Sequence, residues 1–305
     1  MEVVRTVSAF TGALAAARRQ GRDVGLVPTM GALHAGHRSL IDRAVAAHDH
    51  VAVSIFVNPL QFDRADDLDR YPRDLDADLA QCAEAGVATV FAPGVEEMYP
   101  RRPLTSVHVA GVSEPFEGAT RPGHFDGVAT VVAKLFSAAG TCAAYFGEKD
   151  FQQLVVVRRM ASDLSMPVRV VACPTVRAPD GLALSSRNAL LSDDERRAAT
   201  VLWRSLRTGA GAVAEGEDRP DAVARVMAAV VAAEPLAELD YAAAVDAADL
   251  HVPASLSDVE PVRLLVAARL GQVRLIDNCD GRAMAGSGDG RRPAARRLVH
   301  GQGER

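Results

Sequence analysis

The 305-residue sequence has few aromatic side chains and no excess of positive charge. Aromatic residues make up 5%, and 34 Lys and Arg stand against 39 Asp and Glu, for a formal net charge of −5. Proteins that bind nucleic acid through its phosphates present a basic face, and those that bind single strands present aromatic rings for stacking. Neither feature is present, so we expect no nucleic-acid partner.

Long apolar runs and paired cysteines are also missing. No stretch reaches the ~18 uncharged apolar residues of a membrane-spanning helix, and the N-terminus lacks the basic region and apolar core of a signal peptide. The four cysteines, Cys82, Cys142, Cys173 and Cys279, form no CxxC pair. We therefore predict a cytoplasmic protein with reduced, mostly buried thiols and no membrane partner.

Two common nucleotide-binding motifs are absent as well. Neither GxxxxGK[ST] nor GxGxxG occurs, which argues against a P-loop kinase and against a nicotinamide dehydrogenase. The hydrophobic and charged fractions, 49% and 24%, are ordinary for a globular protein. The length allows one or two domains.

The first half of the chain alternates strand patterns with helix patterns. Strands are expected at 23–27, 51–57, 88–91, 143–146 and 168–172, and helices at 12–19, 38–47, 75–85, 124–139 and 151–162. This alternation predicts an α/β fold with a parallel sheet. Ligands of such sheets bind at the carboxyl ends of the strands, so the residues after each strand are the ones to inspect.

The pattern changes near Pro174. Ser192 and Glu195 have the spacing of a capping box that opens a helical stretch to about residue 211. After it come a helix at 220–233 and strand candidates at 239–245, 262–268 and 273–276. We predict a first domain at 1–175, a smaller α+β domain at 176–282 and a flexible, Gly/Arg-rich tail at 283–305.

The segment VPTMGALHAGH, from Val27 to His37, follows the first predicted strand and precedes a helix. Gly36 lets a ligand approach the backbone, and the amide-rich helix start favours an anion. His34 and His37 can face one side of this turn and donate hydrogen bonds to a phosphate as charge shifts in a transition state. A metal site is disfavoured because no carboxylate or cysteine lies at ligand spacing. Simple capping of the helix by the two imidazoles is the other alternative.

The segment YFGEKDFQQ, from Tyr145 to Gln153, also lies at a strand end that enters a helix. Lys149 beside Gly147 suits a phosphate contact by a mobile point charge. Asp150 and Gln153 have capping-box spacing, so a purely structural role is equally open for that pair.

Three polar loops complete the candidates. Arg187, in the segment 180–188, is able to grip two oxygens of a polyphosphate, although a polar loop with no ligand is the simpler interpretation. Gln61 follows the second strand and is placed to bind a polar substrate, unless it belongs to an ordinary turn built on Pro59. For the loop 121–126, substrate contact and helix capping are not separable from sequence.

In this order and spacing, the segments resemble the pantoate–β-alanine ligase (pantothenate synthetase) family. His34-Ala-Gly-His37 alone is the HxGH signature of the nucleotidylyltransferase superfamily. Greater specificity comes from the longer matches, which are Pro28–His37, Phe56–Phe62, Phe146–Asp150 with Gln152 and Gln153, Gly181–Asn188, Leu265–Gly271 and Arg274–Asn278. The resemblance covers about 3–278 and implies a Rossmann-like ATP domain, a small lid-like second domain and a homodimer.

The implied reaction has two steps. The carboxylate of pantoate attacks the α-phosphorus of Mg-ATP to give pantoyl adenylate and pyrophosphate, and the amine of β-alanine then displaces AMP. The resemblance implies that His37, His34 and Lys149 are catalytic and that Gln61 and Gln153 bind pantoate, with Gln61 also near β-alanine. ATP contacts are implied for Met30, Gly31, Ala32, Leu33, His34, Ala35, Gly36, His37, Gly147, Glu148, Lys149, Asp150, Val176, Leu184, Ser185, Ser186 and Arg187.

Some positions depart from the family pattern or align loosely with it. Leu184 stands where Met is common, which is a conservative change. The aspartates at 74–78 align only loosely with residues that would seat Mg²⁺. We therefore expect Mg²⁺ to be carried on the ATP phosphates, with no protein ligand assigned.

Two other functions remain open from sequence. One is a nucleotidylyltransferase that joins AMP to a phosphorylated acceptor, which would need a basic pocket where Gln61 and Gln153 stand. The other is a catalytically inactive ATP-binding regulatory module, which would not need both histidines and Lys149.

Overall fold

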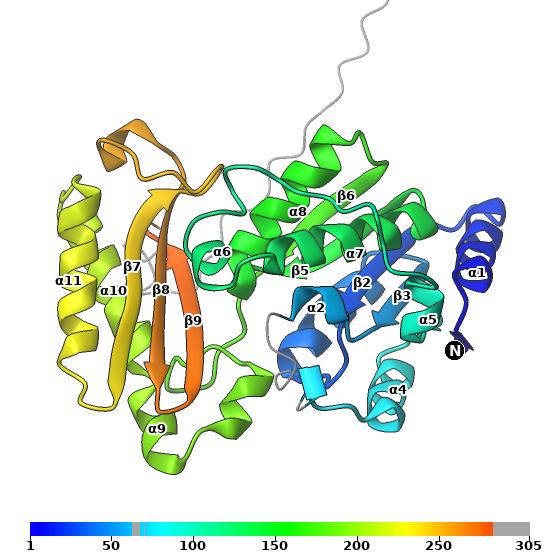
Figure 1. The fold of residues 1–305 in the computed structure, drawn as a ribbon, viewed down its shortest axis with the longest axis horizontal. Helices are drawn as coiled ribbons and strands as arrows, with labels where there is room; N and C mark the ends of the chain where they lie inside the picture. The colour runs from blue at the N-terminus through cyan, green and yellow to red at the C-terminus, as the bar shows by residue number, and fades with distance from the viewer. Residues whose placement is uncertain (63–67, 70, 283–305) are drawn as a thin grey trace, which may run out of the picture.

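Two β-sheets lying side by side organise the chain (Figure 1). The computed structural model describes residues 1–62, 68, 69 and 71–282, so the predicted tail at 283–305 lies outside the described residues. The first sheet is parallel, with the strand order β1-β4-β3-β2-β5-β6. Its strands are β1 (Glu2–Val4), β2 (Val24–Thr29), β3 (His50–Ile55), β4 (Thr89–Phe91), β5 (Cys142–Gly147) and β6 (Val168–Cys173).

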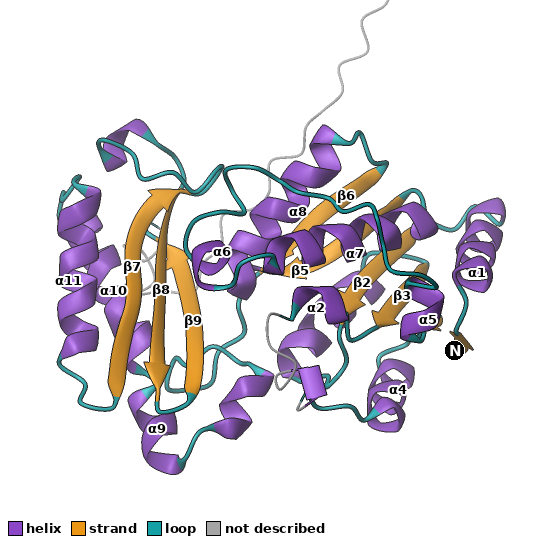
Figure 2. Cartoon of the chain, in the orientation of Figure 1, coloured by secondary structure: helices purple, strands orange, loops and turns teal. Residues whose placement is uncertain are grey.

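Helices cover both faces of this sheet, as a parallel sheet requires (Figure 2). Successive side chains of β2 point to opposite faces of the sheet. Leu26 packs in the core that contains α1, α7 and α8. Val27 packs in the core that contains α2 and α4. This explains why the strands read as continuous apolar runs. The helices are α1 (Val7–Arg19), α2 (Ala35–Val45), α4 (Leu75–Glu84), α5 (Val95–Met98), α6 (Glu117–Thr120), α7 (His124–Ala139) and α8 (Phe151–Asp163), with 3-10 turns η1 (Pro59–Gln61) and η2 (Glu148–Asp150).

The strand β2 continues through Pro28, where the sequence predicts its end. Pro28 pairs with Ser54 of β3, whereas β2 and β5 pair only through Gly25 and Leu26. Proline has no N–H to donate, and it is tolerated here because the β5 side of the strand is unpaired beyond Leu26. The β2–β5 ladder therefore ends at Leu26, whereas the β2–β3 ladder continues to Thr29.

The second sheet is antiparallel, in the order β7-β8-β9, and confirms the predicted smaller α+β unit. Leu264 and Val266 of β8 pack with α10 and α11, while the intervening Leu265 joins the core of the parallel unit. The elements are β7 (Ala237–Asp246), β8 (Val262–Leu270), β9 (Val273–Asp280), α9 (Asp193–Ala198), α10 (Val201–Ala214), α11 (Pro220–Ala232), η3 (Ser186–Leu190) and η4 (Leu256–Asp258).

Two local predictions for this unit have different outcomes. The capping box is confirmed, because the Ser192 hydroxyl accepts from the amide of Glu195 and the Glu195 carboxylate accepts from the amide of Ser192. The single helical stretch to residue 211 is wrong, since α9 ends at Ala198 and α10 begins at Val201.

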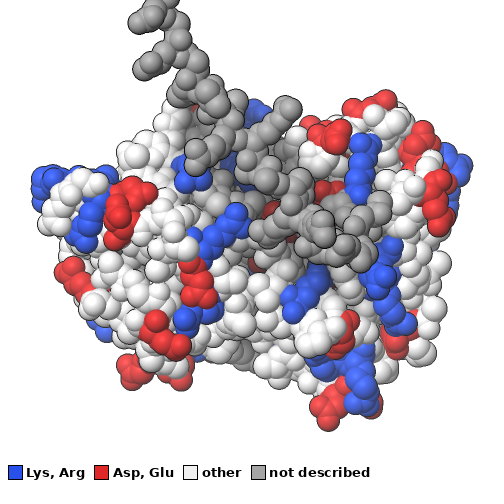
Figure 3. Space-filling view, turned by 180° about the vertical axis from the view of Figure 1, so that it is seen from behind, with Lys and Arg blue, Asp and Glu red and all other residues white. Residues whose placement is uncertain are grey.

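The surface mixes both signs of charge. On the face seen in Figure 3, blue and red side chains are interspersed over the visible described residues. All four cysteines are buried and free of disulfides, as predicted. Within residues 1–62, 68–69 and 71–282, the helices are all too short or too polar to cross a membrane.

Gly127 tests how closely α7 packs on the η1 turn. A Cβ at this position would lie 2.3 Å from the carbonyl oxygen of Leu60, so Gly127→Ala should lower the free energy of unfolding by about 1–3 kcal/mol, the usual cost of overpacking. The matched control is Gly12→Ala in α1, where nothing lies within 4 Å, and it should raise stability by about 0.5–1 kcal/mol. Urea unfolding followed by circular dichroism measures both, and equal effects would contradict the packing argument.

Candidate active site

The two most informative sequence segments meet at a reversal of strand order. From β2 the chain proceeds outward to β3 and β4, and from β5 it proceeds in the other direction to β6. Loops leaving two such neighbours diverge, and the crevice between them is where open α/β sheets bind ligands. The segment Met30–His37 follows β2, and η2 follows β5. The structure therefore brings His34, His37 and Lys149 to the carboxyl ends of two neighbouring strands.

The loop after β2 is held by a carboxylate from α4. Asp78, which is 2% exposed, accepts hydrogen bonds from the amides of Ala32 (2.9 Å) and Leu33 (2.7 Å). Gly31 is required beside it, because its φ is +80° and a Cβ would lie 2.7 Å from Asp78 Oδ2. Asp78 therefore shapes the loop that carries Met30 to Leu33, a role that sequence spacing did not reveal.

His34 and His37 lie against each other at the start of α2. His34 is the N-cap residue, and its Nδ1 accepts from the amide of Gly36 at 3.1 Å. The two ring centroids are 4.1 Å apart. The capping contact foreseen as an alternative thus exists for His34, and it uses only one of the two ring nitrogens. His37 Nδ1 is buried and makes no hydrogen bond within the described part of the chain.

Burial favours the neutral form of both histidines. Burial lowers the pKa of His37 to about 4, with His34 and Lys149 adding to the effect. Burial also lowers the pKa of His34, as does the nearby Lys149. Each neutral imidazole donates one N–H, and a bound anion would favour the protonated form. The pair is therefore suited to a ligand that brings negative charge.

Lys149 and Asp150 lie beside these rings. Lys149 Nζ is 3.2 Å from Asp150 Oδ1, and the charges of both residues act on His34 and His37. Asp150 is the N-cap residue of α8 but makes no side-chain capping bond, so the capping box with Gln153 does not form. The structural explanation offered for that pair is wrong.

A hairpin of the second unit, residues 176–187, lies near Asp150. The amide of Leu184 donates to the carbonyl of Val176 at 2.9 Å, and Ser185 caps η3 by accepting from the amide of Arg187. Arg187 acts electrostatically on Asp150 and on Tyr71, whose hydroxyl also bonds Ser186. Tyr71 is a site neighbour that the sequence did not single out.

Two polar residues at the turn after β3, Asn58 and Gln61, are buried and held by hydrogen bonds. Gln61 is 8% exposed, and its Oε1 accepts from Asn58 Nδ2 at 3.0 Å. Its carbonyl accepts from His124 Nδ1 at 2.8 Å and from Arg121 at 3.2 Å. The role of the loop 121–126 was undecided from sequence. In the structure it holds the backbone of Gln61 through hydrogen bonds. The sequence did not single out Asn58.

Neighbouring glutamines of α8 have different surroundings. Gln152 is buried and is used structurally, since it accepts from the amide of Glu117 and donates to the carbonyls of Val112 and Pro115. Gln153, in the same first turn, is only half-buried. Of the two, Gln153 is the one left to meet a ligand.

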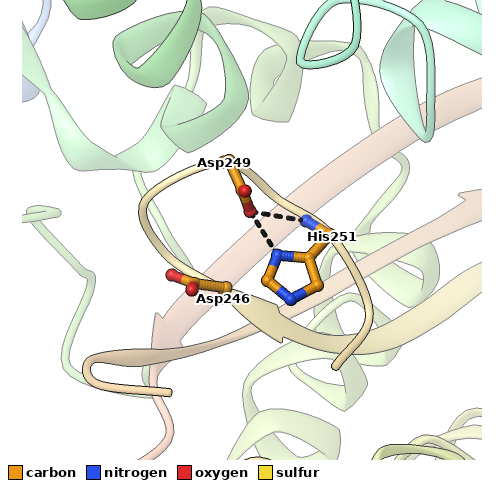
Figure 4. A group of neighbouring side chains, drawn as sticks. All are labelled: Asp246, Asp249 and His251. Atoms are coloured by element: carbon orange, nitrogen blue, oxygen red, sulfur yellow. Dashed lines mark hydrogen bonds and ion pairs between the residues drawn. The ribbon is translucent and has the colours of Figure 1, made fainter. Parts of the chain in front are cut away.

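One group in the described residues has metal-ligand chemistry, formed by Asp246 at the end of β7 and by Asp249 and His251 of the loop that follows (Figure 4). Its contacts are local: Asp249 Oδ1 accepts from the amide of His251 and lies 2.5 Å from Nδ1 of that ring, and Asp246 accepts from the amide of Ala248. The group includes none of the candidate site residues.

Comparison with known proteins identifies the family. Residues 2–280 match the family model described as "Pantoate-beta-alanine ligase". The chain belongs to the pantoate–β-alanine ligase family. A pantothenate synthetase from Roseiflexus sp. strain RS-1 is 52% identical over 279 residues, covering 92% of this chain and 99% of that protein. One from Rubrobacter xylanophilus is 54% identical over 268 residues, covering 86% and 92%.

Solved members of the ligase family share the fold. The pantothenate synthetase of Thermus thermophilus superposes with a TM-score of 0.86 at 47% identity, covering 92% of this chain and all of that one. The Francisella tularensis ligase, described as complexed with "Beta-gamma ATP and Beta-alanine", has a TM-score of 0.74 at 32% identity, covering 92% and 98%.

His124 provides a pH test of the brace under Gln61. Burial and the neighbouring Arg121 lower its folded pKa to about 4, whereas an unfolded histidine titrates near 6.5. Between these pH values His124 is protonated in the unfolded chain but not in the folded chain. The free energy of unfolding therefore falls as pH falls from about 6.5 to about 4. His124→Gln should make this decrease in the free energy of unfolding smaller by about 1–3 kcal/mol. The measurement is the unfolding free energy as a function of pH.

The matched control for this test is His251→Gln. His251 is exposed, and Asp249 raises its pKa, so its loss cannot reduce the destabilisation in acid. If the free energy of unfolding falls by the same amount in acid in His124→Gln and in the unmodified chain, His124 is not a source of the destabilisation.

Proposed function

We propose that this protein condenses (R)-pantoate with β-alanine to form pantothenate, using ATP and releasing AMP and pyrophosphate. A pantoate carboxylate oxygen bonds to the α-phosphorus as the bond to pyrophosphate breaks. The amine of β-alanine then bonds to the acyl carbon, AMP leaves with the bridging oxygen, and the amine loses a proton. The placement of His34, His37 and Lys149 after β2 and β5, where the strand order reverses, is the observation that carries the proposal, together with family membership.

The first step needs positive charge and hydrogen-bond donors. A carboxylate is a poor electrophile until one of its oxygens becomes part of a phosphate leaving group. Attack at the α-phosphorus gathers negative charge on the phosphate oxygens. His34 and His37 donate N–H groups to these oxygens, and Lys149 supplies a full positive charge. His37 takes the role of proton donor once the triphosphate has favoured its charged form.

The remaining ATP contacts come from three segments around the crevice. The loop Met30–His37 presents backbone amides and the start of α2, and Gly147–Asp150 lines the nucleotide from the other side. The hairpin of the second unit closes over the triphosphate through Val176 and Leu184–Arg187. We place the boundary between the two domains at 175/176, with 176–282 acting as the lid.

Pantoate is bound by Gln61 and Gln153. Asn58 Oδ1 accepts from the amide of Leu60, so Asn58 Nδ2 is the group that donates to Gln61 Oε1. This leaves Gln61 Nε2 to donate to a carboxylate or hydroxyl oxygen. Gln153 provides a second amide, and the end of Gln61 extends to the β-alanine position.

Mg²⁺ enters with ATP and is held by phosphates and water. Within the described residues, both oxygens of Asp78 accept loop amides and Asp74 caps α4 through the amide of Ala77, so neither aspartate is assigned as a ligand. We also propose a cytoplasmic homodimer. Sedimentation velocity tests the dimer, which requires twice the mass of the 305-residue chain.

The activity itself is tested by following AMP in the presence of ATP, pantoate and β-alanine. AMP should appear only when all three are present, with one pantothenate formed for each AMP. AMP transfer to a phosphorylated acceptor would instead show a nucleotidylyltransferase, and ATP binding without turnover would show a regulatory module. Either result would replace the ligase proposal.

The chain has only two lysines, which gives the role of Lys149 a matched control. Lys149→Ala and His37→Ala should each lower pantoate-dependent ATP–pyrophosphate exchange by about 10²–10³, as loss of a transition-state donor does. Lys134 is exposed on α7, and Lys134→Ala should leave exchange unchanged. Thermal unfolding should confirm that all three variants fold. An unchanged exchange rate in Lys149→Ala would contradict its assigned role.

A further inference from the structure

A side chain of the antiparallel sheet holds the turn that carries Lys149. Asn278 lies on β9, is 3% exposed, and donates through Nδ2 to the carbonyls of Glu148 (2.9 Å) and Lys149 (2.8 Å). Both amide hydrogens therefore bind consecutive carbonyls of η2. The backbone of Lys149 is fixed at two points by a residue 129 positions away in the sequence.

The orientation of Asn278 is fixed in turn by Arg263 of β8. Arg263 Nε donates to Asn278 Oδ1 at 2.8 Å, and its Nη2 donates to the same oxygen and to Glu148 Oε2 at 3.1 Å. A guanidinium only donates and a carbonyl only accepts, so the Asn278 amide fits in one orientation alone. The guanidinium lies over the ring of Phe151, 4.1 Å from its centroid, which holds it in place.

The base of this arrangement is also buried and paired. Asp277, 3% exposed, accepts from the amide of Asn278 at 2.8 Å. It also accepts two hydrogen bonds from Arg177, at 2.6 and 2.9 Å. Arg177 in turn donates to the carbonyl of Asn278 at 3.1 Å. The backbone of Asn278 is therefore held on both sides, and its side chain reaches η2 from a rigid support.

We infer that Asn278 is a positioning residue for the adenylation step and that it acts through Lys149. Lysine has a flexible stem, so the placement of its ammonium depends on where its backbone is held. Catalytic groups need supports that are themselves locked by packing and hydrogen bonds. Asn278 supplies that support from the second sheet, which makes the antiparallel unit part of the adenylation machinery. The inference rests on the proposed function.

The test uses Asn278→Asp, which keeps the shape and the oxygen facing Arg263 but replaces the two donors to η2. We expect pantoate-dependent ATP–pyrophosphate exchange to fall by about 10- to 100-fold, as a small misplacement of a catalytic group does. A double-mutant cycle with Lys149→Ala then shows whether the effect passes through Lys149. The double variant should exchange at the rate of Lys149→Ala within about twofold.

Tyr241→Phe is the matched control for the interface. It removes one hydrogen bond, from Tyr241 to Glu117 Oε1 at 2.8 Å, that also joins β7 to the parallel unit but does not touch η2. Its exchange rate should equal that of the unmodified protein. If Asn278→Asp fails to fold, as judged by thermal unfolding, Asn278→Ser retains one donor and enters the same cycle with an intermediate expected loss.

The outcomes separate this inference from the function on which it rests. An unmodified protein with no pantoate-dependent exchange overturns the proposed function, and the inference falls with it. An active protein whose Asn278 variants exchange normally overturns the inference alone. Losses that multiply in the double variant, or an equal loss in Tyr241→Phe, likewise show that Asn278 only joins the two sheets.

Discussion

The reversal of strand order between β2 and β5 is the constraint on which the candidate site depends. The two strands pair through Gly25 and Leu26, and Pro28, which has no N–H to donate, ends that ladder. A parallel sheet whose chain proceeds outward in both directions from one pair of strands leaves a crevice there, because the crossovers on either side lie on opposite faces. The histidine loop and the Lys149 turn line this crevice because each directly follows one of the two strands.

Buried polar side chains then hold the loops around the crevice. Asp78 binds the amides of Ala32 and Leu33, and Asn278 binds the carbonyls of Glu148 and Lys149. Each is only 2–3% exposed, and inside a protein such groups are costly unless they are paired, so the paired arrangement is strongly favoured over any other. The loops are therefore ordered before a substrate arrives, which is the condition for electrostatic stabilisation of a transition state.

Sequence-based prediction succeeded for elements whose signals lie close together in the chain and failed for those defined by contacts between distant residues. The helix α7 has the predicted bounds His124–Ala139 because its signals are local, an apolar pattern between Gly123 and Gly140. The three-residue strand β1 went unpredicted, since only its pairing with β4 defines it. The break between α9 and α10 also went unpredicted. In the site, the histidine and Lys149 motifs were found, whereas Asp78 was found only as a loosely aligned aspartate.

The amino-acid sequence by itself determined the α/β class, the smaller second unit, the family and the segments that carry the chemistry. These depend on periodicity and on motifs whose residues are close together in the chain. Only the tertiary structure decided that Asp78 shapes the histidine loop, that His124 braces Gln61 and that Asn278 holds the Lys149 turn. Each of these contacts joins residues more than 40 positions apart, and its pairing depends on how the sheets pack, which no local pattern encodes.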